Sequence, residues 1–155
     1  MMEFALKILC VCKANLNLSP RAASVCETLF HENGLPSVAV MSAGTKANRL
    51  SGDDDYFKET FGVLSPTQLT QGLIDFADVI VALDSDIVTT LAQDYEVSGK
   101  TIVNLEIPDR YSLREGNLES LYEILRVKLE PYVKDWAEKI NGSCSLPNHP
   151  KTEVK

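Results

Sequence analysis

The most constraining feature of this sequence is an apolar segment, residues 4–12, that leads through a short polar loop to Ser19-Pro20 and a helical pattern. The aliphatic run is typical of a buried strand, and Ser followed by Pro is typical of the first positions of a helix. A strand that enters a loop ending at a helix N-terminus directs backbone N–H groups and the positive end of the helix dipole toward one small volume. The sequence therefore predicts an anion-binding loop over residues 13–19.

Cys12 lies at the mouth of this loop. The positive end of a helix dipole favours the thiolate form of a cysteine, and the thiolate is the form that acts as a nucleophile. The alternative is a buried cysteine at the end of a strand, which is a common place for an unpaired cysteine. The residues alone leave both interpretations open.

Short aliphatic segments alternate with helical patterns along the whole chain. The predicted strands are residues 5–12, 38–42, 79–83 and 101–105, and the predicted helices are 20–32, 54–61, 70–76, 86–92 and 118–140. A β-α-β succession with right-handed crossovers predicts an α/β fold with three layers, in which a four-stranded parallel sheet carries helices on both faces. Ligands of such sheets bind beyond the C-terminal ends of the strands, where the Cys12 loop falls.

The length of 155 residues predicts one domain over residues 1–140, followed by a flexible polar tail over 141–155. The last helix has apolar residues spaced by three or four, which is the pattern of an amphipathic helix. Pro131 lies within it and is expected to kink the helix or split it in two.

Charge and composition exclude several classes of partner and cofactor. The net charge of −7 argues against nucleic acid and anionic membranes. No run is long enough to span a membrane and no signal peptide is visible, so a cytoplasmic location is expected. The four cysteines form no Cys-x-x-Cys pair, and the acidic run 53–55 is interpreted as a helix start. We therefore expect no metal and no cofactor.

Three motifs, in order along the chain, resemble those of one enzyme family. Residues 11–20 resemble the loop Val-Cys-x-Gly-Asn-x-Cys-Arg-Ser-Pro of the low-molecular-weight protein tyrosine phosphatases. Ser42-Ala43-Gly44-Thr45 matches the family's Ser-Ala-Gly-Thr segment, and residues 108–111, Pro-Asp-Arg-Tyr, resemble its Asp-Pro-Tyr loop. The resemblance extends from about residue 6 to residue 140 and implies the phosphotyrosine protein phosphatase I-like fold.

The resemblance also implies roles for the matched residues. Cys12 would be the nucleophile, Asp109 the general acid, and Ser19 would cap the helix and donate a hydrogen bond to the thiolate. Asn15 would hold the loop backbone, because Asn tolerates a left-handed conformation. The residues that would form the phosphate loop are Lys13, Ala14, Asn15, Leu16, Asn17, Leu18 and Ser19, and those that would form the pocket wall are Asn48, Arg110 and Tyr111.

The departures from the family pattern fall on the same loops. Leu18 replaces an arginine whose planar guanidinium would hold two phosphoryl oxygens. Asn17 replaces the second loop cysteine and Ala14 a glycine, while Arg110 replaces the proline of the acid loop and Asn48 an aromatic residue. The change at position 18 is the most serious for catalysis.

Other interpretations of these residues stay open. Asp109 after Pro108 is also compatible with a plain turn, and Leu18 with a side chain that points into the core. Lys13 and Arg21 are expected to be solvated surface charges.

The leading hypothesis is a phosphatase-like protein with impaired catalysis, a pseudophosphatase that binds a phosphotyrosine protein or another protein partner. The second is a weakly active aryl phosphate phosphatase that uses Cys12 and Asp109 and recruits Arg110 as its cation. A thiol-relay arsenate reductase is set aside, because it would need a further cysteine pair between Cys26 and Cys144. The oligomeric state is left open.

Overall fold

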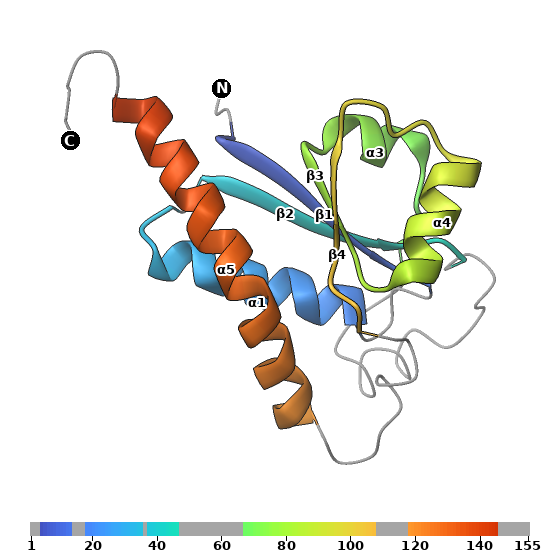
Figure 1. Cartoon of the computed structure of the whole chain (residues 1–155), viewed down its shortest axis with the longest axis horizontal. Coiled ribbons are helices and arrows are strands. Elements are labelled where there is room, and N and C mark those ends of the chain that lie inside the picture. The colour runs from blue at the N-terminus through green and yellow to red at the C-terminus, as the bar shows by residue number, and fades with distance from the viewer. Residues whose placement is uncertain (1–3, 14–17, 36, 47–66, 108–117, 146–155) are drawn as a thin grey trace.

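A four-stranded, all-parallel sheet forms the centre of the molecule (Figure 1). The computed structural model describes residues 4–13, 18–35, 37–46, 67–107 and 118–145. The strands are β1 (Leu6–Cys12), β2 (Val38–Gly44), β3 (Val79–Ala82) and β4 (Thr101–Asn104), in the spatial order β2-β1-β3-β4. The predicted parallel sheet is thereby confirmed.

β1 is the strand on which the sheet is assembled. It pairs with β2 along its whole length, from Leu6 opposite Val38 to Cys12 opposite Gly44. On its other side it pairs with β3, so that Cys10 lies between Ser42 and Val81. Its residues Ile8, Leu9, Cys10 and Val11 are fully buried, as expected for a parallel strand covered on both faces.

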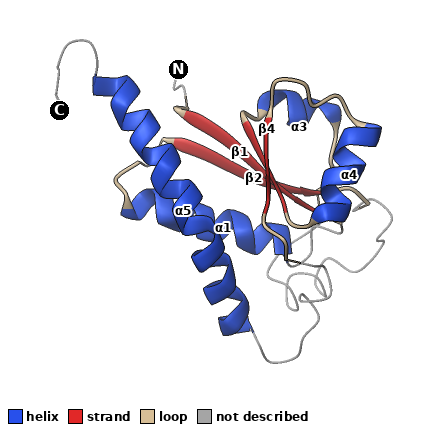
Figure 2. Ribbon diagram, viewed as in Figure 1, coloured by secondary structure: helices blue, strands red, loops and turns tan. Residues whose placement is uncertain are grey.

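Helices cover both faces of the sheet, as predicted (Figure 2). Alternate residues of β1 point to opposite faces of the sheet. On one face, Ile8, Cys10 and Cys12 pack toward α1 (Leu18–Glu32) and α5 (Leu118–Ser145). Leu9 and Val11 pack toward α3 (Gln71–Phe76) and α4 (Ser85–Asp94). This alternation follows from the period of two along a strand.

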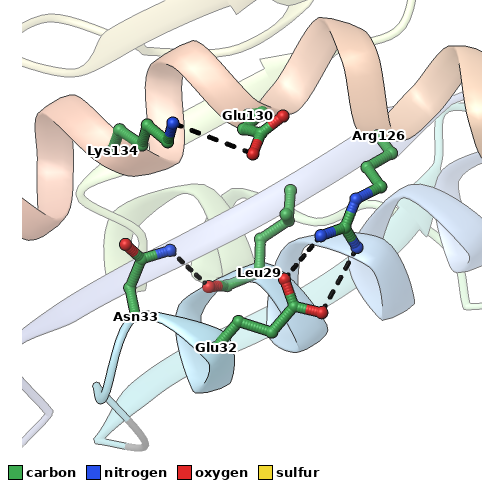
Figure 3. Close-up of polar contacts among 6 residues, drawn as sticks. All are labelled: Leu29, Glu32, Asn33, Arg126, Glu130 and Lys134. Carbon is green, nitrogen blue, oxygen red and sulfur yellow. Dashed lines mark hydrogen bonds and ion pairs between the residues drawn. The ribbon is translucent and has the colours of Figure 1, made fainter.

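α1 and α5 lie against each other on one face, where apolar and charged contacts join them. The rings of Phe30 and Trp136 are stacked with their centroids 6.2 Å apart. At the end of α1, the Arg126 guanidinium donates two hydrogen bonds to the Glu32 carboxylate (Figure 3). The distance is 2.5 Å from Nη2 to Oε1 and 3.4 Å from Nη1 to Oε2. This hydrogen bond and the charge of Arg126 lower the pKa of the partly exposed Glu32 carboxyl. α1 ends at Glu32, and the chain turns at Gly34, whose φ of 79° suits a residue without a side chain.

Several helix boundaries differ from the prediction, and those of α1 and α5 have the most consequence. α1 begins at Leu18 rather than at Pro20, so the strand-to-helix loop is shorter than expected. α5 continues through Pro131 as one helix and ends at Ser145, beyond the predicted end at residue 140. Of the two effects expected of Pro131, the split into two helices does not occur, and the first part of the expected tail is helical. The predicted helix 54–61 and the rest of the tail lie outside the described residues.

The packing of α5 on the sheet generates a stability prediction. Leu129 is fully buried in the core below α5, whereas Val127 on the same helix is 61% exposed. Leu129→Ala should lower the free energy of unfolding by about 2–5 kcal/mol, because it removes buried methyl groups and leaves a cavity. Val127→Ala should change it by less than about 0.5 kcal/mol. Urea unfolding followed by circular dichroism measures both, and equal losses would contradict this packing.

Candidate functional site

Cys12 lies at the C-terminal edge of the sheet, at the end of β1. It is the last residue of β1, and its side chain is 3% exposed. The Thr45 N–H donates a 3.0 Å hydrogen bond to the Cys12 carbonyl oxygen, and the Lys46 N–H donates a 2.8 Å bond to that of Lys13. The pairing of β1 with β2 therefore continues one step past the strands and fixes the backbone from which the loop departs.

Ser19 reaches Cys12 from the first turn of α1. The Ser19 Oγ lies 3.0 Å from the Cys12 Sγ and 3.3 Å from the carbonyl oxygen of Ala43, to which it donates. Its side chain is fully buried. The predicted pairing of Ser19 with Cys12 is present, but the prediction that Ser19 caps α1 was wrong, because the helix already begins at Leu18.

The Ser19 hydroxyl has two potential acceptors, the Cys12 sulfur and the Ala43 carbonyl oxygen. A serine hydroxyl has a single O–H, so it donates to Ala43 or to the sulfur but not fully to both. With Cys12 as a neutral thiol, the S–H can donate to the Ser19 Oγ while Ser19 donates to Ala43. With Cys12 as a thiolate, a hydrogen bond between the two residues requires the Ser19 hydroxyl to donate to the sulfur. The role of Cys12 as a nucleophile stays a prediction.

Cys10 and Cys26 are buried thiols away from the loop. Burial raises the pKa of the Cys10 thiol well above its usual value, and burial with the nearby Glu27 charge raises that of Cys26 to about 12. Both thiols are therefore protonated at neutral pH and are poor nucleophiles. Of Cys10, Cys12 and Cys26, Cys12 alone lies at the sheet edge beside a loop and a helix N-terminus.

A polar residue that the sequence interpretation did not single out supports the segment after β2. Gln68 forms a parallel bridge with Gly44, and its Nε2 donates to the carbonyl oxygens of Thr45 at 2.9 Å and Leu69 at 3.2 Å. The Gly44 N–H donates to Thr67, and the Leu69 N–H donates to Gly44. Gln68 thereby helps to hold Thr45, which in turn bonds to Cys12. No local pattern in the sequence identifies such a residue.

The two cations near the loop differ in their exposure. Lys13 is exposed, as expected. Arg21 is only 8% exposed, and its guanidinium carbon lies 5.9 Å from the centre of the Tyr122 ring of α5. The prediction that Arg21 is a solvated surface charge was therefore wrong. The contact with Tyr122 joins α1 to α5, and a single sequence does not display such a contact.

Negative charge gathers elsewhere on the same edge. Asp84 and Glu106, which follow β3 and β4, line a hollow of about 340 Å³ together with Ser85 and Asp86. Asp84 caps α4 by accepting from the Ile87 N–H at 3.1 Å. A larger hollow of about 520 Å³, lined by Phe30 and Val38 among others, lies near the far end of α1 and contains no cysteine. An anion at the Cys12 loop would thus bind near an acidic surface.

Several predicted site residues lie outside the described part of the chain. They are Ala14, Asn15, Leu16 and Asn17 of the loop, the pocket residues Asn48, Arg110 and Tyr111, and the general acid Asp109. Leu18 is described only as the first residue of α1. The roles of these residues stay predictions.

The described residues also bear on metals and membranes. No group of three or more His, Cys, Asp or Glu side chains among them could hold a metal ion. Within the same residues, no helix is both long and apolar enough to cross a membrane.

Comparison with known proteins gives a family match over most of the chain. The sequence profile described as "Low molecular weight phosphotyrosine protein phosphatase" matches residues 7–145. A search of curated protein sequences gave no match.

Several solved structures share this fold. A low molecular weight phosphotyrosine phosphatase from Vibrio cholerae is 22% identical with a TM-score of 0.69, over 86% of this chain and 98% of that one. A protein tyrosine phosphatase from Entamoeba histolytica is 21% identical with a TM-score of 0.68, over 86% and 98%. The tyrosine phosphatase Wzb from Escherichia coli K30, solved with phosphate, is 25% identical with a TM-score of 0.62, over 88% and 99%.

Anion binding at the loop can be measured directly. The helix N-terminus offers backbone donors and a dipole, but position 18 offers no guanidinium, so inorganic phosphate should bind with a dissociation constant of about a millimolar or weaker. Titration followed by the amide chemical shifts of residues 13–19 measures it, with sodium chloride at matched ionic strength as the control. Micromolar saturation at these amides would show that another group fully replaces an arginine.

Proposed function

Because the chain belongs to the low molecular weight phosphotyrosine protein phosphatase family, we propose that it is a member with impaired catalysis that acts as a binding or regulatory module. The observation that carries this proposal is Leu18 at the first position of α1. The family resemblance implies an arginine there. We further propose that its ligand is a phosphorylated protein, most simply a phosphotyrosine protein, in the cytoplasm.

The loss of that arginine weighs more than the other departures. A phosphoryl group in the transition state has its charge spread over three equatorial oxygens, and catalysis consists mainly of positioning and neutralising them. Comparable arginines contribute on the order of 10³ to 10⁵ in rate. A leucine side chain has no donor and no charge, and backbone N–H groups supply only partial charges.

The remaining parts of the site support retained binding. The Cys12–Ser19–Ala43 contacts and the Thr45 bond to Cys12 keep the base of the loop in a defined arrangement. α1 presents its N-terminus beside Cys12, where the dipole favours a bound anion. These features favour a loop that still accepts a phosphoryl group over one that has collapsed.

The second candidate is a weakly active phosphotyrosine or aryl phosphate phosphatase. In that reaction the Cys12 thiolate would attack phosphorus and form a phosphocysteine, while Asp109 would give its proton to the leaving phenolate. Asp109 would then take a proton from the water that hydrolyses the phosphocysteine, releasing phosphate and restoring the thiolate. The retained Cys12 and Asp109 favour this candidate, in which Arg110 would supply the cation.

Turnover of p-nitrophenyl phosphate separates the two candidates. The native protein should hydrolyse it at least about 10³-fold more slowly than an active relative, from the expected contribution of the arginine. Cys12→Ser is the control, because any rate that survives this substitution comes from a contaminant. A rate within tenfold of an active relative that Cys12→Ser abolishes would contradict the proposal of impaired catalysis.

Restoring the arginine tests whether Leu18 is the main defect. Leu18→Arg should raise turnover and should shift the alkylation of Cys12 by iodoacetamide to lower pH, because a nearby cation stabilises the thiolate. Rescue should be partial, since Ala14 and Arg110 also depart from the family pattern. Leu18→Met, which adds no charge, is the matched control. A folded Leu18→Arg protein without gain in either measurement would show that the loop does not adopt the phosphate-binding conformation.

A further inference from the structure

The side chain of Gln68 lies where the chain leaves β2 beside the candidate site. Its Nε2 donates to the carbonyl oxygen of Thr45 at 2.9 Å and to that of Leu69 at 3.2 Å. Gln68 is partly buried, which strengthens both bonds relative to bonds in open water. One amide group therefore joins Thr45 to the segment 67–69.

The segment that carries Gln68 is itself fixed to the core. Leu69 is buried among the apolar residues that lie between the sheet and helices α3 and α4. Thr70 caps α3, since its side chain accepts a 3.2 Å hydrogen bond from the Leu73 N–H. Gln68 thus extends from a firmly packed base, so its amide can hold Thr45 in place instead of moving with it.

Thr45 passes this restraint on to the candidate nucleophile. The Thr45 N–H donates to the Cys12 carbonyl oxygen at 3.0 Å, and the next N–H, that of Lys46, donates to the Lys13 carbonyl oxygen at 2.8 Å. These bonds hold the backbone from which the Cys12 sulfur reaches the Ser19 Oγ at 3.0 Å. Each link between the amide and the sulfur is therefore an observed hydrogen bond or a covalent connection within one residue.

A loosely held Cys12 would be a weaker nucleophile. A hydroxyl stabilises a thiolate only while the two atoms stay at hydrogen-bond distance. If the end of β1 frays, the Cys12 sulfur spends less time beside Ser19, and the thiolate loses part of this stabilisation. The neutral thiol loses less, because hydrogen bonds to uncharged groups are weaker.

We propose that Gln68 is a positioning residue: by holding Thr45 against the end of β1, it keeps the Cys12 sulfur beside Ser19 and makes Cys12 more reactive. This role rests on the proposed function only in taking Cys12 as the nucleophile, since neither turnover nor phosphate binding enters it.

The test compares Gln68→Met with the matched control Gln71→Met. Methionine keeps the length of glutamine and removes the amide. Gln71 also ties two segments together, because its Nε2 donates to the Glu96 carbonyl oxygen at 2.8 Å and its Oε1 accepts from the Glu96 N–H at 2.9 Å. It does so from α3 and not from the segment after β2, so Gln71→Met removes a comparable tertiary link without touching Thr45.

Two measurements follow the proposed chain of contacts. Alkylation of Cys12 by iodoacetamide is measured against pH, with peptide fragmentation in mass spectrometry to separate Cys12 from the other cysteines. Gln68→Met should raise the pH of half-maximal alkylation by at least about 0.5 unit, which is about a threefold lower rate below the midpoint, and Gln71→Met by less than about 0.2 unit. Hydrogen exchange of the Thr45 and Lys46 amides should become at least about threefold faster in Gln68→Met alone.

Each outcome decides the inference. It is overturned by a Gln68→Met profile that moves no more than that of Gln71→Met, by a shift in alkylation without faster exchange at Thr45 and Lys46, or by a native Cys12 that alkylates no more readily than Cys10. If Gln68→Met does not fold, Gln68→Asn replaces it, since the shorter side chain withdraws the amide from Thr45, and the same thresholds apply. Turnover is not measured, so failure here is distinguishable from failure of the proposed function.

Discussion

The two-sided pairing of β1 is the interaction on which the rest of the structure depends. Because β2 and β3 both hydrogen-bond to β1, its backbone is satisfied within the sheet and its side chains can be fully buried on both faces. The direction of the parallel strands then brings the end of β1, the segment after β2 and the start of α1 to one edge. Cys12, Thr45 and Ser19 meet there as a consequence of strand pairing, although Thr45 is distant from the other two in the sequence.

The charges of the molecule are distributed around that edge in an uneven way. The chain is acidic as a whole, and Asp84 and Glu106 add negative charge beyond the ends of β3 and β4. The N-terminus of α1 contributes the positive end of its dipole beside Cys12. An anion that binds at this edge must therefore be held by local hydrogen-bond donors, since the long-range field of the acidic protein repels anions.

Much of the fold was predictable from the sequence, because β1 to β4 are short apolar segments between clear turn residues and their order permits few topologies. The site was less predictable. The contact of Cys12 with Ser19 followed from the resemblance to the family, but the burial of Arg21 and the bonds of Gln68 depend on elements that are distant in sequence. The Tyr122 ring of α5 lies near the Arg21 guanidinium, and the segment that contains Gln68 pairs with Gly44. Such tertiary contacts leave no periodic pattern.

The Ser19 hydroxyl proton connects the binding of an anion with the protonation state of Cys12. When Cys12 is a thiol, Ser19 is free to donate to the Ala43 carbonyl, and all three groups are satisfied without any cation. Formation of the thiolate draws the Ser19 proton away from Ala43, which leaves a buried carbonyl with one donor fewer, at a cost of about 1–3 kcal/mol if nothing replaces it. An arginine at position 18 would offset this cost by stabilising the thiolate, and leucine cannot. Under the proposed function, leucine at position 18 would remove the group that holds the phosphoryl oxygens and would favour the protonated form of Cys12, so that one substitution would weaken both binding and reactivity at this edge.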